Sequence, residues 1–264
     1  MSRSTPVRTS CDACASSCAT ASVSRCSIAS PSSATRSKKI ARSRGCSAVS
    51  SGASSRRNGT ARWSTTFATR AQLEYGVRRS VTNLDLVFHT DAAWLDLPPE
   101  LVGLYCINPA REGGVSRFVS LVTVHNELVR RHAPVLPRLY RAFPWDRQAE
   151  HAPGDVKVAW RPIFSYDGRG FMACVNDKLI ETGAELAGEA LDDEARASLT
   201  ATRALLDAPE LRVEFTIERG QVQFINNRQF AHSRTDFTDA PEPHLKRHMI
   251  RLWTREEGRR TFHG

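Results

Sequence analysis

The 264-residue sequence carries a formal net charge of +9, from 37 basic and 28 acidic residues. Such an excess would ordinarily indicate nucleic acid or an anionic surface as a partner, but residues 1–80 alone hold 14 basic residues against two acidic ones, which leaves 23 basic and 26 acidic residues for 81–264. The charge therefore belongs to the N-terminal segment, and no specific nucleic-acid partner is expected. No apolar run reaches the length of a membrane helix, so no membrane partner is expected either.

Residues 1–75 form a low-complexity segment rich in Ser, Ala, Arg and Thr. Because it offers too little apolar surface to offset its ordering entropy, we expect disorder there and a folded domain over 76–264. A targeting peptide, a frameshifted or mis-started reading and unspecific nucleic-acid contact remain alternatives for the tail. Cys11, Cys14 and Cys18 could form a zinc half-site, but no partner pair supports it. Seven thiols without a secretory signal favour a cytoplasmic location.

The first half of the predicted domain contains three strands and a helix. Alternating apolar residues predict a strand over 84–89, and an apolar run predicts a second over 101–108. A turn over 109–114 follows, with two glycines that permit unusual backbone angles. A short strand over 116–118 then leads to Ser120, the expected N-cap of a helix that runs towards Arg131.

The second half is also dominated by strands. Strands are expected over 160–166 and 170–175, joined by a turn at 167–168, and an amphipathic helix over 191–206. Further strands are expected over 213–217, 222–225 and 248–253. This density of strands, with one or two covering helices, indicates a β-rich barrel or sandwich.

His89 and Asp91 are the first candidate site residues. They share a parity, so on an extended strand both side chains point to one face and can reach one ion. Iron(II) in non-haem oxygenases takes two imidazoles and one carboxylate on one triangular face. A polar pair at a strand end is the alternative explanation. His232 follows a predicted strand end at 224–228 and is a plausible third ligand.

Arg247 and Arg251 share one face of the last predicted strand with Met249 and Trp253. A guanidinium that faces inwards is costly unless it meets an anion, and its fork suits a carboxylate. A salt bridge to Asp or Glu is the commoner outcome for a single arginine. The two arginines are too far apart, at about 13 Å along a strand, to grip one small group.

These residues carry a resemblance to a known family. From about residue 80 to the C-terminus, the sequence resembles the TauD/TfdA family of Fe(II)- and 2-oxoglutarate-dependent dioxygenases. The matching stretches, in family order, cover 88–91, 109–116, 224–234 and 247–253. The resemblance implies a mainly β fold with covering helices, a double-stranded β-helix or jelly roll. The segment that family members normally carry before His-x-Asp is replaced here by the low-complexity tail.

The resemblance also implies the roles of individual residues. His89, Asp91 and His232 would be the iron ligands and catalytic centre. Arg247 and Ser116 would bind the distal carboxylate of the co-substrate 2-oxoglutarate, Arg251 would contact an acidic substrate, and Asn227 would tie down a strand end.

The implied activity is oxidation, by default hydroxylation, of a C–H bond in a small-molecule substrate. Fe(II), 2-oxoglutarate and O2 would be required, with succinate and CO2 as co-products. The alternative is a truncated or frameshifted inactive homologue that retains the metal-binding motif. Neither the substrate nor the oligomeric state is predicted.

Overall fold

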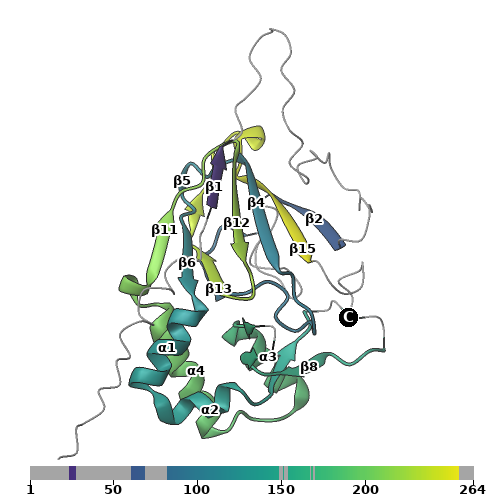
Figure 1. The fold of residues 1–264 in the computed structure, drawn as a ribbon. Helices are drawn as coiled ribbons and strands as arrows, with labels where there is room; N and C mark the ends of the chain where they lie inside the picture. Colours follow the sequence, from purple (N-terminus) through teal and green to yellow (C-terminus); the bar gives the residue numbers. More distant parts are fainter. Residues whose placement is uncertain are drawn as a thin grey trace, which may run out of the picture.

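The computed structural model describes residues 82–255, except 149–150, 152–153, 167 and 169, together with the backbone of two strands nearer the N-terminus. Figure 1 shows two antiparallel sheets that converge at one end, with the helices gathered at the other. The mainly β architecture with covering helices confirms the predicted fold class. None of the described helices is long and apolar enough to span a membrane.

The larger sheet has the strand order β1-β12-β4-β15-β2, and every pairing in it is antiparallel. Odd-numbered positions of β15 face the core, because Met249 and Trp253 are buried there. The strands of this sheet are β1 Ser24–Ser27, β2 Ala61–Ala68, β4 Leu101–Asn108, β12 Gln221–Asn226 and β15 His248–Arg255.

The second sheet has the order β11-β6-β13-β3, again wholly antiparallel. Phe88, Phe118 and Ala231 of this sheet belong to the same buried cluster as Val102 and Trp253 of the larger sheet. The two sheets therefore share one hydrophobic core. Its strands are β3 Leu86–His89, β6 Ser116–Ser120, β11 Arg212–Phe215 and β13 Phe230–Arg234.

Three short sheets complete the strands. They pair β5 with β14, β7 with β8 and β9 with β10. Strands are therefore present where they were expected over 160–166 and 170–175, although residue 167 of the predicted turn lies outside the described residues. The strands are β5 Glu112–Gly113, β7 Phe143–Asp146, β8 Val158–Arg161, β9 Phe164–Tyr166, β10 Phe171–Ala173 and β14 Phe237–Thr238.

Helices α1, α3 and α4 begin at side-chain caps. Ser120 accepts a hydrogen bond from the Thr123 amide, which confirms it as the N-cap of α1, and Asn176 and Asp192 cap α3 and α4. The sequence had not indicated α3. The α-helices are α1 Leu121–Arg131, α2 Leu136–Leu139, α3 Asp177–Ala187 and α4 Asp193–Leu206, and short 3-10 turns occupy η2 Ala133–Val135, η3 Pro209–Leu211 and η4 Pro243–Leu245.

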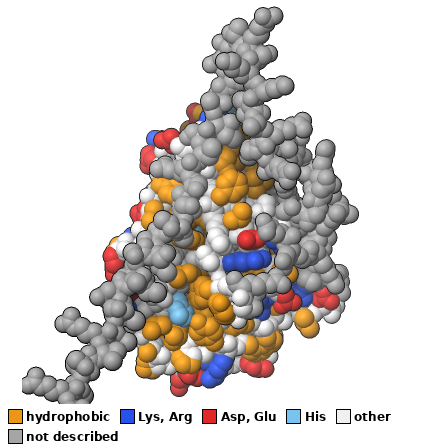
Figure 2. Space-filling view, in the orientation of Figure 1, with side chains coloured by type: hydrophobic (Ala, Val, Ile, Leu, Met, Phe, Trp, Pro, Cys, Tyr) orange, Lys and Arg blue, Asp and Glu red, His pale blue; other side chains and the backbone are white. Residues whose placement is uncertain are grey.

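The surface at the helical end is comparatively apolar. In the space-filling view, hydrophobic side chains gather there and along the middle of this face, while charged side chains lie mainly at the margins (Figure 2). Val129 and Tyr140, near the α1–α2 corner, remain 47% and 42% exposed.

The N-terminal segment differs from the expectation of disorder at two places. Strands β1 and β2 lie within residues 1–75 and pair with the edges of the larger sheet. Edge strands offer unpaired backbone groups, which can pair with a segment whatever its side chains. Cys11, Cys14 and Cys18 lie outside the described residues, and the boundary at residue 75 stays a prediction.

Gly183 allows α3 to pack closely against β7. A Cβ atom at this position would lie 2.5 Å from the Pro144 carbonyl oxygen and 2.8 Å from the Asp146 amide nitrogen. Both contacts are with backbone, which cannot move aside cheaply. This close packing positions Val175, which lies just before α3. The Val175 amide donates to the Thr90 side chain, and its carbonyl accepts from the Thr90 amide. Thr90 is the residue between His89 and Asp91.

We expect Gly183→Ala to lower the free energy of unfolding by about 1–2 kcal/mol, because overpacking against β7 outweighs the gain in helix propensity. Urea denaturation would measure the change. The matched control is Gly170→Ala, because a Cβ atom there would meet nothing within 4 Å. Equal denaturation midpoints for the two variants would contradict the close packing.

Candidate metal centre

The pairing of β3 with β13 brings two histidines together. His89 and His232 are directly opposite each other in the antiparallel register, and their ring centroids are 4.3 Å apart. His232 lies within β13, where the sequence had indicated only a position soon after a strand end. Opposed residues on one face of a sheet are close neighbours, so two sequence-distant imidazoles share one place.

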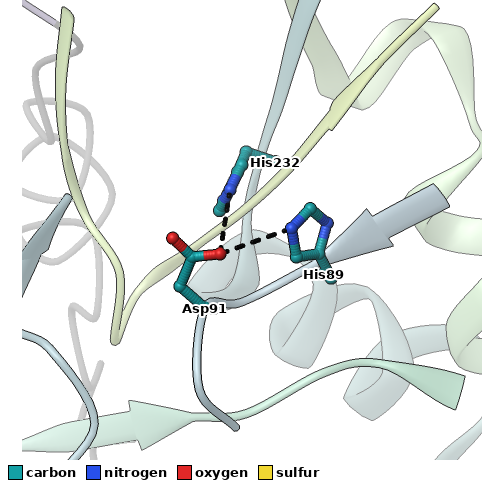
Figure 3. Close-up of side chains that lie close together, drawn as sticks. All are labelled: His89, Asp91 and His232. Atoms are coloured by element: carbon teal, nitrogen blue, oxygen red, sulfur yellow. Dashed lines mark ion pairs between the residues drawn. The ribbon is translucent and has the colours of Figure 1, made fainter. Parts of the chain in front are cut away.

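Asp91 completes the group from the turn that follows β3. Its Oδ1 lies 3.5 Å from His89 Nε2 and 3.8 Å from His232 Nε2, and Figure 3 shows the three side chains converging. One ligand atom from each residue lies within 4.8 Å of the others. The exposed fractions of the side chains of His89, Asp91 and His232 are only 12%, 4% and 11%. The structure thus brings together the three residues predicted as metal ligands.

The protonation states suit metal binding. His89 Nδ1 lies 2.9 Å from the Val87 carbonyl oxygen, which can only accept, so Nδ1 donates there and Nε2 is the ring nitrogen that faces Asp91. Burial, with His89 nearby, lowers the pKa of His232 to about 3, so this imidazole is neutral near pH 7. Burial alone would raise the pKa of Asp91, but the Arg251 guanidinium and the two histidines outweigh it and hold that pKa well below its usual range.

The backbone around Asp91 is held on both sides. The Asp91 amide donates to Asn227 Oδ1 at 2.7 Å, and Asn227 Nδ2 donates to the carbonyls of Asp91 and Pro99 at 3.0 and 3.1 Å. Asn227 therefore ties down the turn, as the resemblance implied. Ala92, the next residue, has a φ of 53°, a strained angle for a residue with a side chain.

Two side chains of β15 donate hydrogen bonds to the Asp91 carboxylate. Arg251 Nη1 lies 3.2 Å from Oδ1 and 3.1 Å from Oδ2, and Trp253 Nε1 donates to Oδ2 at 2.6 Å. Sequence reasoning missed both contacts. It placed Arg251 and Trp253 on one face of the last strand, but it had no means of identifying a partner 160 residues away.

Arg247 and Ser116 are buried, 8% and 5% exposed, but no contact joins either to the three ligands in the described part of the chain. Arg247 lies just before β15, with its guanidinium carbon 5.2 Å from the centre of the Phe237 ring. Ser116 begins β6 opposite Arg234, whose guanidinium carbon is 4.5 Å from the same ring.

Comparison with known proteins finds the family that the sequence resembles. The family model described as "Taurine catabolism dioxygenase TauD, TfdA family" matches residues 30–253. The FR-33289 synthase of Streptomyces rubellomurinus is 25% identical over 190 residues, which cover 70% of this chain and 54% of the synthase. A uridine-5'-phosphate dioxygenase from a Streptomyces species is 29% identical over 159 residues, which cover 59% of this chain and 57% of that protein.

Solved structures of non-haem iron oxygenases have the same fold. OrfP, in complex with Fe and α-ketoglutaric acid, superposes with a TM-score of 0.55 at 15% identity, over 74% of this chain and 56% of its own. Asparagine oxygenase, in complex with Fe(II), hydroxyasparagine and succinate, superposes with a TM-score of 0.53 at 19% identity, over 68% of this chain and 52% of its own. This chain spans about half the length of these relatives. The predicted jelly-roll fold is confirmed, and the chain belongs to the TauD/TfdA family.

Proposed function

We propose that the protein is an Fe(II)- and 2-oxoglutarate-dependent dioxygenase that oxidises a C–H bond of a small-molecule substrate, most simply by hydroxylation. The observation that carries the proposal is the convergence of two imidazoles and one carboxylate on one point. OrfP and asparagine oxygenase, which share the fold, have been crystallised with iron and with α-ketoglutaric acid or succinate.

The donor set fits Fe(II). His89, Asp91 and His232 offer two imidazole nitrogens and one carboxylate oxygen, the combination that non-haem iron oxygenases use. When bound, iron together with 2-oxoglutarate and O2 supplies the oxidation of the substrate, with succinate and CO2 as co-products. The protein holds the three donors on one side and keeps the centre largely away from water.

Arg247 fits the co-substrate. Its Nε is buried without a hydrogen-bond partner, and no carboxylate lies within ion-pair distance of its guanidinium in the part of the chain that the structure describes. Burial lowers the pKa of Arg247 to about 10, so the side chain remains a cation near pH 7. A buried cation without an anion is costly, and the distal carboxylate of 2-oxoglutarate would supply one.

The surroundings of Arg247 strengthen the attraction for an anion. The pKa of Arg234 is lowered to about 10, first by burial and then by the positive charge of nearby Arg247, and both guanidinium groups lie against Phe237. Arg234 is satisfied by the backbone carbonyls of residues 82, 84 and 235. Arg247 therefore remains the side chain that needs a partner, and Ser116, opposite Arg234, is the proposed second donor.

The substrate side of the site is proposed only in outline. Named relatives include an asparagine oxygenase and a uridine-5'-phosphate dioxygenase, so a polar small molecule is the reasonable class. An acidic substrate contact by Arg251 stays a prediction, since such a substrate would have to share that guanidinium with Asp91. The cytoplasmic location also stays a prediction.

The alternative is an inactive homologue that keeps only the metal motif. No observation specifically favours it. Such a protein would bind iron but would have no use for a buried cation at Arg247, so a co-substrate titration separates the two functions.

The metal site is tested by removing one ligand. Wild-type protein should bind one Fe(II) per chain under anaerobic conditions, and His232→Ala should lose this binding because only two donors remain. Equilibrium dialysis with iron analysis would measure the stoichiometry. The control is His125→Ala, which removes a histidine on α1 that contacts Tyr140. Equal tight binding by wild type and His232→Ala would remove His232 from the site.

The co-substrate site is tested at Arg247. Arg247→Ala should weaken 2-oxoglutarate binding to the Fe(II)-loaded protein by between about tenfold and several thousandfold, because it removes a charge-assisted contact worth on the order of 2–5 kcal/mol. Iron affinity should change little. Anaerobic titration calorimetry would measure both affinities.

The matched control is Arg255→Ala. This change removes a buried arginine at the end of β15, the strand that Arg247 precedes, whose Nη1 donates to the Leu97 carbonyl. It should leave 2-oxoglutarate binding intact. Loss of binding in Arg255→Ala but not in Arg247→Ala would mean that the wrong arginine has been assigned. Wild-type protein that binds Fe(II) but not 2-oxoglutarate would favour the inactive homologue.

A further inference from the structure

We propose that the indole N–H of Trp253 is a positioning group that makes Asp91 present Oδ1, and not Oδ2, to the metal. The inference rests on the proposed metal centre and extends it to a residue that does not itself bind the metal. It is carried by the different surroundings of the two carboxylate oxygens.

Oδ1 faces the histidines, and Oδ2 faces β15. The distances from Oδ1 to His89 Nε2 and His232 Nε2 are 3.5 and 3.8 Å, whereas Trp253 Nε1 donates to Oδ2 at 2.6 Å. Trp253 is 5% exposed. If the carboxylate turned so that Oδ2 also faced the histidines, this buried hydrogen bond from Trp253 to Asp91 would be lost.

Arg251 fixes the orientation of the indole. Its guanidinium carbon lies 4.3 Å from the centre of the Trp253 ring, and its Nη1 contacts both oxygens of Asp91. Because Arg251 contacts the two oxygens almost equally, at 3.2 and 3.1 Å, it holds the carboxylate in place without choosing between them. The choice of oxygen therefore falls to Trp253.

This choice has a consequence for the coordination sphere. A carboxylate can bind a metal through one oxygen or two. With Oδ2 held by Trp253, Asp91 would offer a bound metal one oxygen beside one nitrogen from each histidine, which would leave room for co-substrate and substrate. Groups that orient a ligand in this way typically account for 10–100-fold in metal affinity.

The test compares Trp253→Phe with Trp145→Phe. Trp145 is also fully buried and also donates through Nε1, to the Arg161 carbonyl at 3.0 Å, but it lies in the β7–β8 pair. Each variant thus loses one buried indole N–H bond, and only one of them loses the contact with Asp91. Co(II), a redox-stable probe for the Fe(II) site, would be titrated into each metal-free protein.

We expect Trp253→Phe to bind Co(II) about 10–100-fold more weakly than wild type, and Trp145→Phe to bind as wild type does. Both variants should lose comparable thermal stability without metal, so the difference in affinity cannot come from general loosening. If Trp253→Phe fails to fold, replacing the Trp253 indole by benzothiophene keeps the ring size and removes only the N–H, and the same weakening is expected.

Each outcome decides between distinct ideas. Equal Co(II) affinity for wild type and Trp253→Phe would overturn the positioning role while leaving the metal centre intact. Equal weakening in both tryptophan variants would also overturn it, because the effect would then be structural. Failure of wild-type protein to bind Co(II) would instead reject the proposed metal centre itself.

Discussion

The antiparallel register between β3 and β13 is the constraint on which the site depends. Side chains alternate across a strand, so a slip of one residue would turn His232 to the opposite face and leave His89 without its neighbour. Three features of the surroundings secure this arrangement. β13 is also paired in register with β6, the pairing with β3 shifts only after His232, and Val175 bonds to the Thr90 backbone just beyond His89. Sheet pairing therefore positions the two histidines, whereas Asp91 is positioned by the turn after β3 that Asn227 ties down.

Charge compensation at Asp91 explains how the centre can fold before any metal arrives. A carboxylate that is 4% exposed would be costly if left alone, but Arg251 and Trp253 satisfy it from the facing sheet. The Arg251 charge also outweighs part of the effect of burial on the Asp91 pKa and so helps to keep this carboxylate ionised, as a metal ligand must be. This arrangement has an energetic cost, because the Arg251 charge opposes an entering cation. Retaining Arg251 beside a metal ligand makes physical sense if orientation and ionisation of Asp91 matter more than this repulsion.

The sequence predicted the parts of the structure that follow from local periodicity. The period of two predicted His89 and Asp91 on one face of a strand; the two side chains do converge, but Asp91 lies in the turn after β3. Ser120 was identified as a cap from its position before an apolar run. Local periodicity could not predict contacts between residues that are far apart in the sequence. The identification of His232 depended on a family resemblance, because its pairing with His89 spans most of the domain. Helix α3 was missed since its packing depends on the absence of a side chain at Gly183, and β1 and β2 were missed since backbone pairing leaves no mark on composition.

Arg247 and Arg251 show why residue type alone does not fix a role. Both are buried cations near the start of one strand, and for each the chemistry of guanidinium predicts a carboxylate partner. Arg251 finds that partner within the protein, at Asp91, and so becomes part of the metal ligand's support. Arg247 has no carboxylate within ion-pair distance of its guanidinium among the described residues, although Asp239 accepts from its backbone amide at 2.7 Å and its charge acts on the side chain. Folding alone would not favour such an arrangement, since no direct ion pair among the described residues offsets the desolvation cost of the Arg247 guanidinium. The cost is offset if the partner arrives from outside as an anion, and that is the physical reason for assigning the two arginines different tasks.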